Sequence, residues 1–169
     1  MNEVSAVRCA SYDPETLDRA MAELLAPIGG LDWVQPGMTV AVKANLVTFM
    51  KPDAAATTHP EALCALVRLL KERGAEVVVG DSPGGLYNAA FVQRVYAATG
   101  MQKVEAAGAA LNQDFSVADV HFPEGRAMRS FTCTAWLQKA DAIIEFCKLK
   151  GLKHVTLNTV GYKPHHSHF

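Results

Sequence analysis

The chain has 169 residues, 50% of them hydrophobic and 20% charged, a balance that predicts one globular domain with a buried core and excludes wholesale disorder. Its net charge of −1 argues against a dedicated nucleic-acid-binding protein. No run approaches the ~18 apolar residues of a membrane span, and the N-terminus lacks the basic start and apolar stretch of a signal peptide, so we expect a cytoplasmic protein with no membrane partner.

The first part of the chain predicts a strand, a helix and a second strand. Residues 4–10 have the composition of an opening strand. Residues 13–15, Asp-Pro-Glu, predict a helix start, because a carboxylate can cap the helix and proline fits its first position. The glycine pair at 29–30 predicts the end of this helix. A strand is expected over residues 39–43, and a loop over residues 44–57.

The central part repeats the alternation of helix and strand. Residues 58–61, Thr-His-Pro-Glu, match a capping box and predict a helix that ends at residues 73–74. The run AEVVVG at 75–80 is typical of a strand buried on both faces. A further helix is expected over residues 88–99, with Gly100 closing it.

The last part has weaker patterns. Residues 117–123 and 126–133 predict two strands around a Pro-Glu-Gly turn, and a short helix is expected before a strand over residues 141–146. Strands that alternate with helices indicate an α/β fold, which we expect to be a three-layer sandwich with a central, mostly parallel sheet. We assign residues 1–150 to this single domain and residues 151–169 to a C-terminal tail or an incomplete remainder of the domain.

Polar residues follow three of the predicted strands, at the carboxyl edge where ligands bind in open parallel sheets. Lysines there can hold an anion, and glycines let backbone N–H groups approach it. The residues predicted to hold a ligand or cofactor at this edge are Lys43, Asn45, Ser82, Gly84, Gly85, Lys148 and Lys150.

Each of these features also has a structural interpretation. Asp81 could bind a ribose hydroxyl or a metal or act as a base, or it could cap the next helix while the Ser-Pro-Gly-Gly sequence that follows makes a turn. Lys43 could meet a ligand or reach solvent, and the same holds for Lys148 and Lys150. His59, near the start of a helix, could be a neutral proton carrier or a surface residue. We take His59 and Asp81 as the catalytic candidates.

The cysteines and histidines of the sequence do not form a recognisable metal-binding motif. Cys9, Cys64, Cys133 and Cys147 are scattered without a CxxC pair, so neither a disulfide framework nor an iron–sulfur cluster motif is predicted in this chain. The histidines at 165–168 could contact a transition metal, but closely spaced histidines at a chain terminus bind metals adventitiously. We therefore predict no metal site.

Four segments, in the same order, resemble a known family. They are VAVKANLV at 40–47, TTHPEALCALVRLLKERGAEVVVGDSPGG at 57–85, TG at 99–100 and ADAIIEFCKLK at 140–150. This pattern resembles the domain of unknown function 362 family. Many of its longer members carry a ferredoxin-like module with 4Fe–4S cluster cysteines, and their description as iron–sulfur proteins depends on that module. This chain lacks those cysteines and departs from the family pattern after residue 150, so it resembles a truncated or rearranged member.

Two functions follow as expectations. The resemblance implies the core domain of a cytoplasmic, redox-associated protein, and the strand-end residues imply that it binds an anionic small molecule or cofactor. The alternative is a non-catalytic module that docks a redox partner protein or forms a homodimer, because an incomplete sheet exposes an edge or an apolar face. A metal-dependent hydrolase built on Asp81 and the histidines is the weakest interpretation, since no ligand spacing supports it.

Overall fold

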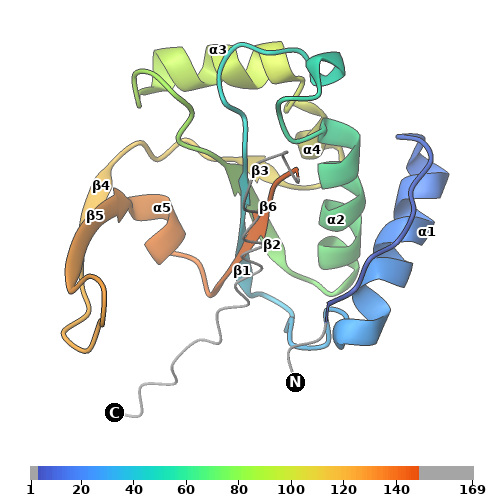
Figure 1. The fold of residues 1–169 in the computed structure, drawn as a ribbon, viewed down its shortest axis with the longest axis horizontal. Coiled ribbons are helices and arrows are strands. Elements are labelled where there is room, and N and C mark those ends of the chain that lie inside the picture. The colour runs from blue at the N-terminus through green and yellow to red at the C-terminus, as the bar shows by residue number, and fades with distance from the viewer. Residues whose placement is uncertain (1–3, 149–169) are drawn as a thin grey trace.

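A computed structural model of the chain describes residues 4–148 (Figure 1). Its centre is a four-stranded sheet in the order β3-β2-β1-β6, in which every neighbouring pair is parallel. The predicted α/β fold with a central, mostly parallel sheet is therefore confirmed. The strands are β1 (Thr39–Ala44), β2 (Glu76–Gly80), β3 (Ala110–Leu111) and β6 (Ala142–Phe146).

The strand order contains a switch point, where strands are added on the opposite side of β1 from the earlier ones. The chain moves outward from β1 to β2 and β3, and then returns to place β6 on the other side of β1. The carboxyl ends of β1 and β6 thus lie side by side at the switch point, where ligands bind in open α/β sheets. These ends point toward the top of Figure 1, where α3 (Ala89–Thr99) lies above them.

One face of the sheet is covered by a layer of helices. This layer consists of α1 (Pro14–Leu25), α2 (Pro60–Glu72) and the short α4 (Lys103–Ala106), with α2 in contact with both of the others (Figure 1). Alternate residues of β1 and β2 point into it, as the two-residue period of a strand requires. The fully or almost fully buried residues at this interface include Val40, Val42, Val77, Val79, Leu63, Leu66, Val67 and Leu70.

The start of α2 differs from the prediction in one residue. The N-cap is His59, whose Nδ1 accepts the Glu61 N–H at 3.3 Å. Thr58 was predicted as the cap, but its hydroxyl accepts the Asn45 N–H at 2.9 Å and donates to the Phe146 carbonyl oxygen at 3.0 Å. The Thr58 hydroxyl makes these two hydrogen bonds because Thr58 lies against the ends of β1 and β6. A local capping motif in the sequence does not reveal this tertiary contact.

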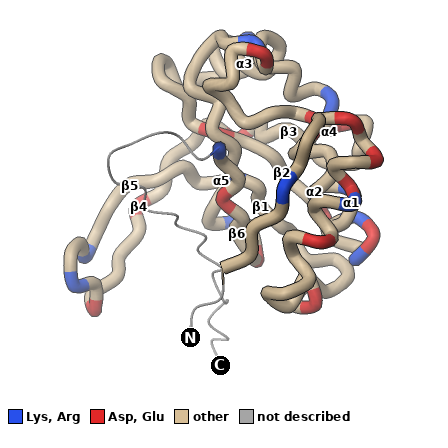
Figure 2. Tube along the Cα trace, turned by 45° about the vertical axis from the view of Figure 1, so that its right-hand side comes forward, with Lys and Arg blue, Asp and Glu red and all other residues tan. Residues whose placement is uncertain are grey.

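The second face has a thinner layer. It consists of the one-turn helix α5 (Ala135–Gln138) and an antiparallel hairpin of β4 (Val117–His121) and β5 (Ser130–Thr134). The hairpin stands away from the rest of the described chain in Figures 1 and 2. The predicted pair of strands around residues 123–125 is thus confirmed, but it forms a sheet of its own.

Three further differences from the sequence prediction concern secondary structure. Residues 4–10 form no strand, because no neighbouring strand pairs with them and their side chains are exposed or half-buried. The elements α4 and β3 were not predicted, since four and two residues are too few to carry a period. Short 3-10 turns occupy Ala26–Ile28 and Pro52–Ala54. Lys150, the histidines at 165–168 and the predicted tail lie outside the described residues.

Among residues 4–148, no helix is both long enough and apolar enough to cross a membrane.

Candidate functional site

Asp81 joins the two loops that follow β1 and β2. Its side chain is buried, and its carboxylate accepts the N–H of Leu46 at 2.7 Å and the N–H of Ser82 at 2.8 Å. Burial raises the pKa of Asp81, while the Leu46 N–H, the Lys43 charge and the Ser82 N–H oppose this rise. The carboxylate is therefore used chiefly to hold the two loops together.

Lys43 lies between two carboxylates at the carboxyl edge. Its Nζ is 3.2 Å from Oε1 of Glu145 and 3.7 Å from Oδ1 of Asp81. Glu145 was missed by sequence reasoning, although it is the neighbour of Lys43 in the register of β1 and β6. That register depends on the strand order, which no local pattern in the sequence discloses. The positive charge of Lys43 is thus largely compensated within the protein.

The last two glycines of the Gly-Asp-Ser-Pro-Gly-Gly turn are exposed, but each has a contact within the protein. The N–H of Gly84 donates to the Val47 carbonyl oxygen at 2.8 Å, so it is already used. Gly85 has φ +133°, and a Cβ at this position would overlap the ring of Phe91. Ser82 is exposed at the same turn. Close packing against Phe91 and the positive φ are a structural reason for glycine at position 85.

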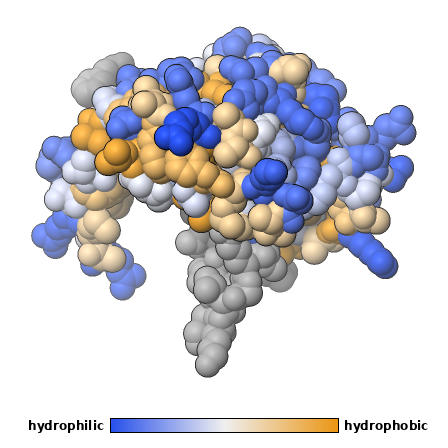
Figure 3. All heavy atoms as spheres, turned by 90° about the horizontal axis from the view of Figure 1, so that it is seen from above, coloured by the Kyte–Doolittle hydropathy of each residue, from blue (hydrophilic) through white to orange (hydrophobic). Residues whose placement is uncertain are grey.

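A basic groove lies at the same edge of the sheet, at the C-terminal end of α3. Its volume is about 710 Å³. It is bounded by the N-terminal segment, the loop after β1, the start of α2, the end of α3 and Lys148, two residues after β6. Figure 3 looks down on this carboxyl edge, where hydrophilic side chains gather on the right and an apolar area lies toward the left. The side chains that give the groove its chemistry are Tyr12, Lys51, Asp53, His59 and Lys148.

His59 presents a hydrogen-bond donor in this groove. Because Nδ1 accepts the Glu61 N–H, the neutral ring carries its proton on Nε2. The ring stacks on Tyr12 with the centroids 3.6 Å apart and the planes 13° apart. Burial and then the Lys148 charge lower the pKa of His59, while Glu61 opposes them. A neutral ring with a protonated Nε2 suits hydrogen bonding to an anion better than accepting a proton from a substrate.

The structure thus separates the predicted site residues into two groups. His59 and Lys148 line the basic groove, together with Tyr12 and Lys51, which were not singled out from the sequence. Lys51 belongs to the loop that was expected at this edge, but Tyr12 comes from a segment with no such signal. The remaining described residues of the predicted site lie along the neighbouring loops and not in the groove lining: Lys43, Asn45, Asp81, Ser82, Gly84 and Gly85.

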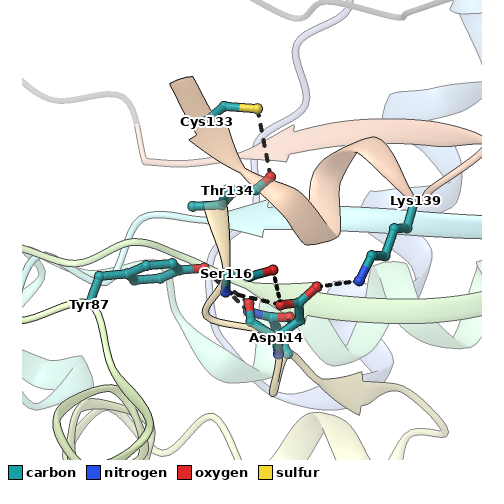
Figure 4. A network of polar contacts seen from close by, with 7 residues as sticks. Tyr87, Asp114, Ser116, Cys133, Thr134 and Lys139 are labelled. Atoms are coloured by element: carbon teal, nitrogen blue, oxygen red, sulfur yellow. Dashed lines mark hydrogen bonds and ion pairs between the residues drawn. The ribbon is translucent and has the colours of Figure 1, made fainter. Parts of the chain in front are cut away.

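A second, smaller groove of about 290 Å³ lies on the thinly covered face of the sheet. Figure 4 shows the polar network at its side. Asp114 pairs with Lys139 at 2.6 Å and accepts the hydroxyl and the N–H of Ser116 at 2.5 and 3.0 Å. The Lys139 ammonium and the Ser116 hydroxyl hold the pKa of Asp114 well below its usual range. Every one of these groups has a partner, so the network serves to join α5 to the segment after β3.

No group of three or more potential metal ligands occurs within residues 4–148.

Comparison with known proteins identifies the family. The model of the family described as "Domain of unknown function (DUF362)" matches residues 40–164. The chain belongs to this family. The match includes β1, the loop after it, α2 and β2, and hence most of the elements around the groove.

One relative and the solved structures complete the comparison. The chain is 37% identical over 84 residues to the "Thylakoid-associated protein sll1697" of Synechocystis sp. (strain ATCC 27184 / PCC 6803 / Kazusa). The aligned part is 49% of this chain and 26% of that relative, so the DUF362 chain spans about a quarter of the relative's length. No solved structure matches the chain.

Proposed function

We propose that this DUF362 chain binds an anionic small molecule or cofactor in the basic groove. The observation that carries the proposal is the meeting of Lys51, Lys148 and the Nε2–H donor of His59 in one groove at the carboxyl edge of the sheet. Within residues 4–148, neither lysine forms an ion pair, whereas Lys43 contacts two carboxylates. Both ammonium groups are therefore available to a ligand.

The other predicted residues receive a supporting role in this proposal. Asp81, Gly84 and Gly85 shape the loops beside the groove through the contacts described above. Direct ligand contacts of Lys43, Asn45, Ser82 and Lys150 stay predictions. A cytoplasmic location, expected from the N-terminal sequence and the lack of a long apolar run, stays a prediction. An association with redox chemistry or a redox partner, which the resemblance implies, also stays a prediction.

The pKa of His59 offers a direct test. In the free protein we expect it below 6.5, the ordinary value for histidine. Sulfate is a dianion throughout the range from pH 5 to 8, so its binding should favour the imidazolium and raise the pKa of His59. NMR titration of the His59 ring, in sodium sulfate and in sodium chloride of equal ionic strength, measures this change.

Two variants make the test specific. Lys148→Ala should weaken sulfate binding about three- to tenfold, since one exposed charge contributes roughly 1 kcal/mol. Lys139→Ala removes an equal charge that is paired with Asp114 on the other face, and should leave the binding unchanged. A sulfate response that is absent at His59, or equal in both variants, contradicts the proposal.

A second candidate function is docking of a redox partner protein or of a second copy of the chain. The observation that favours it is the β4–β5 hairpin, in which no further strand of the described chain pairs with the outer edge of either strand. It also exposes four large apolar side chains, Val117, Phe122, Met128 and Phe131. Light scattering over a hundredfold concentration range should show a rising mass if the partner is a second copy. A constant monomer mass excludes the homodimer and leaves a separate protein as the partner.

A further inference from the structure

We propose that the ligand of the basic groove is a phosphate monoester, bound through its dianionic phosphate group. The inference rests on the proposed anion-binding function and names the class of anion. It begins from the number and kind of donors in the groove, which are two ammonium groups and one imidazole N–H. A phosphate monoester presents three terminal oxygens to them, whereas a carboxylate presents two.

The lysines of the groove differ from their neighbours in charge compensation. Lys103 forms an ion pair with Glu61, and Lys43 contacts Asp81 and Glu145. Lys51 and Lys148 have no carboxylate within 4 Å in the described part of the chain. A dianion gains from both of these charges, because no carboxylate of the described residues compensates either of them.

Tyr12 holds two of the three donors near each other. The Tyr12 ring stacks on the His59 ring. Nζ of Lys148 lies 5.8 Å from the centroid of the same Tyr12 ring. A cation at this distance from an aromatic ring is attracted to it. Tyr12 is therefore a positioning residue, because it orders donors that come from the start of α2 and from the chain after β6.

The rest of the groove has the size and chemistry for the organic part of an ester. At about 710 Å³ the groove is much larger than one phosphate group. The small side chains of Ala55, Ala97 and Ala98 line it and leave room for carbon atoms. Asp53 also lines it and provides an acceptor for a hydroxyl group of the ligand. With Asp53 ionised, the side chains leave the groove a net positive charge, so the second negative charge of the phosphate still contributes to binding.

A pair of probes of the same shape tests this inference. Phenyl phosphate is mostly dianionic at pH 7.5, because its second pKa is about 6. Phenyl sulfate has the same shape and one negative charge. Isothermal titration calorimetry should show that phenyl phosphate binds about three- to tenfold more tightly, as expected for one extra charge near exposed lysines. Lys51→Ala should reduce this ratio, and Lys71→Ala, at the far end of α2, should not.

The outcomes separate the two proposals. Equal affinity for both probes overturns the phosphate inference and leaves the anion groove standing. Binding of neither probe overturns the proposed function as well. For Tyr12, replacement by phenylalanine keeps the ring and should preserve the affinity for phenyl phosphate, whereas Tyr12→Ala should lower it. Equal affinities in these two variants contradict the positioning role.

Discussion

Replacement of Asp81 by alanine is expected to lower the free energy of unfolding by about 2–4 kcal/mol, because each unsatisfied buried group costs about 1–3 kcal/mol. The carboxylate accepts the N–H groups of Leu46 and Ser82, and Leu46 is fully buried. Alanine leaves the Leu46 N–H without an acceptor and releases the loop after β1 from the turn after β2. Urea denaturation of the wild-type and variant proteins measures the loss.

Asp81→Asn is the matched control for this prediction. Its single carbonyl oxygen can accept one of the two N–H groups, so it should recover part of the stability lost in Asp81→Ala. The variant also lacks the charge that faces Lys43. An Asp81→Ala protein as stable as the wild type would show that the carboxylate does not hold the loops. It would then return Asp81 to the catalytic role predicted from the sequence.

Replacement of Gly85 by alanine is the second large effect, with an expected loss of about 2–4 kcal/mol from overpacking and backbone strain together. A Cβ at this position would overlap the ring of Phe91, and φ is +133°, which residues with side chains rarely adopt. The ring must move or the turn must open. Urea denaturation again gives the magnitude, and the NMR signals of the Phe91 ring report the displacement.

Gly84→Ala separates this effect from a general need for glycine in the turn. Its Cβ would lie 3.3 Å from the Val47 carbonyl oxygen, and the backbone is not in the positive-φ region. We expect a loss within about 1 kcal/mol, as for a substitution without a strong clash. Equal losses at Gly84 and Gly85 would mean that the packing of Phe91 does not determine the turn.

The sequence was sufficient for the main elements because their signals are local. The valine run at 77–79 predicts a buried strand without knowledge of its neighbours. The helix that begins at Pro14 is capped by Asp13, as predicted, and the helix that follows Asn88 ends at Gly100. The position of these elements in a parallel sheet then follows from the alternation of strand and helix.

The details of the site depend on contacts between distant parts of the chain. Glu145 compensates Lys43 because β6 pairs with β1, about 100 residues apart. Tyr12 stacks on His59, which comes from a different element, although no periodic pattern connects the two residues. Local reasoning also chose Thr58 over His59 as the helix cap, because it could not include the carbonyl oxygen of Phe146 that engages Thr58.

For the glycine-rich turn after β2, the sequence predicted the position but not the contacts with the rest of the protein. Its place at the carboxyl edge was predicted correctly from the strand that precedes it. Its role as a cradle for a ligand stays a prediction, although the Gly84 N–H already donates to the Val47 carbonyl oxygen and Gly85 lies against Phe91. Among residues 4–148, Lys51 and Lys148 of the basic groove form no ion pair, so we propose the site along the same edge, toward His59 and Lys148.

The central claim is that the basic groove, and not the glycine-rich turn, holds the anion. A crystal structure of the protein grown with saturating phenyl phosphate tests it most directly. The account predicts the phosphate group within hydrogen-bond distance of Lys51, Lys148 and Nε2 of His59. A phosphate group bound instead to the N–H groups of the turn at residues 82–85, with the groove empty, would contradict it.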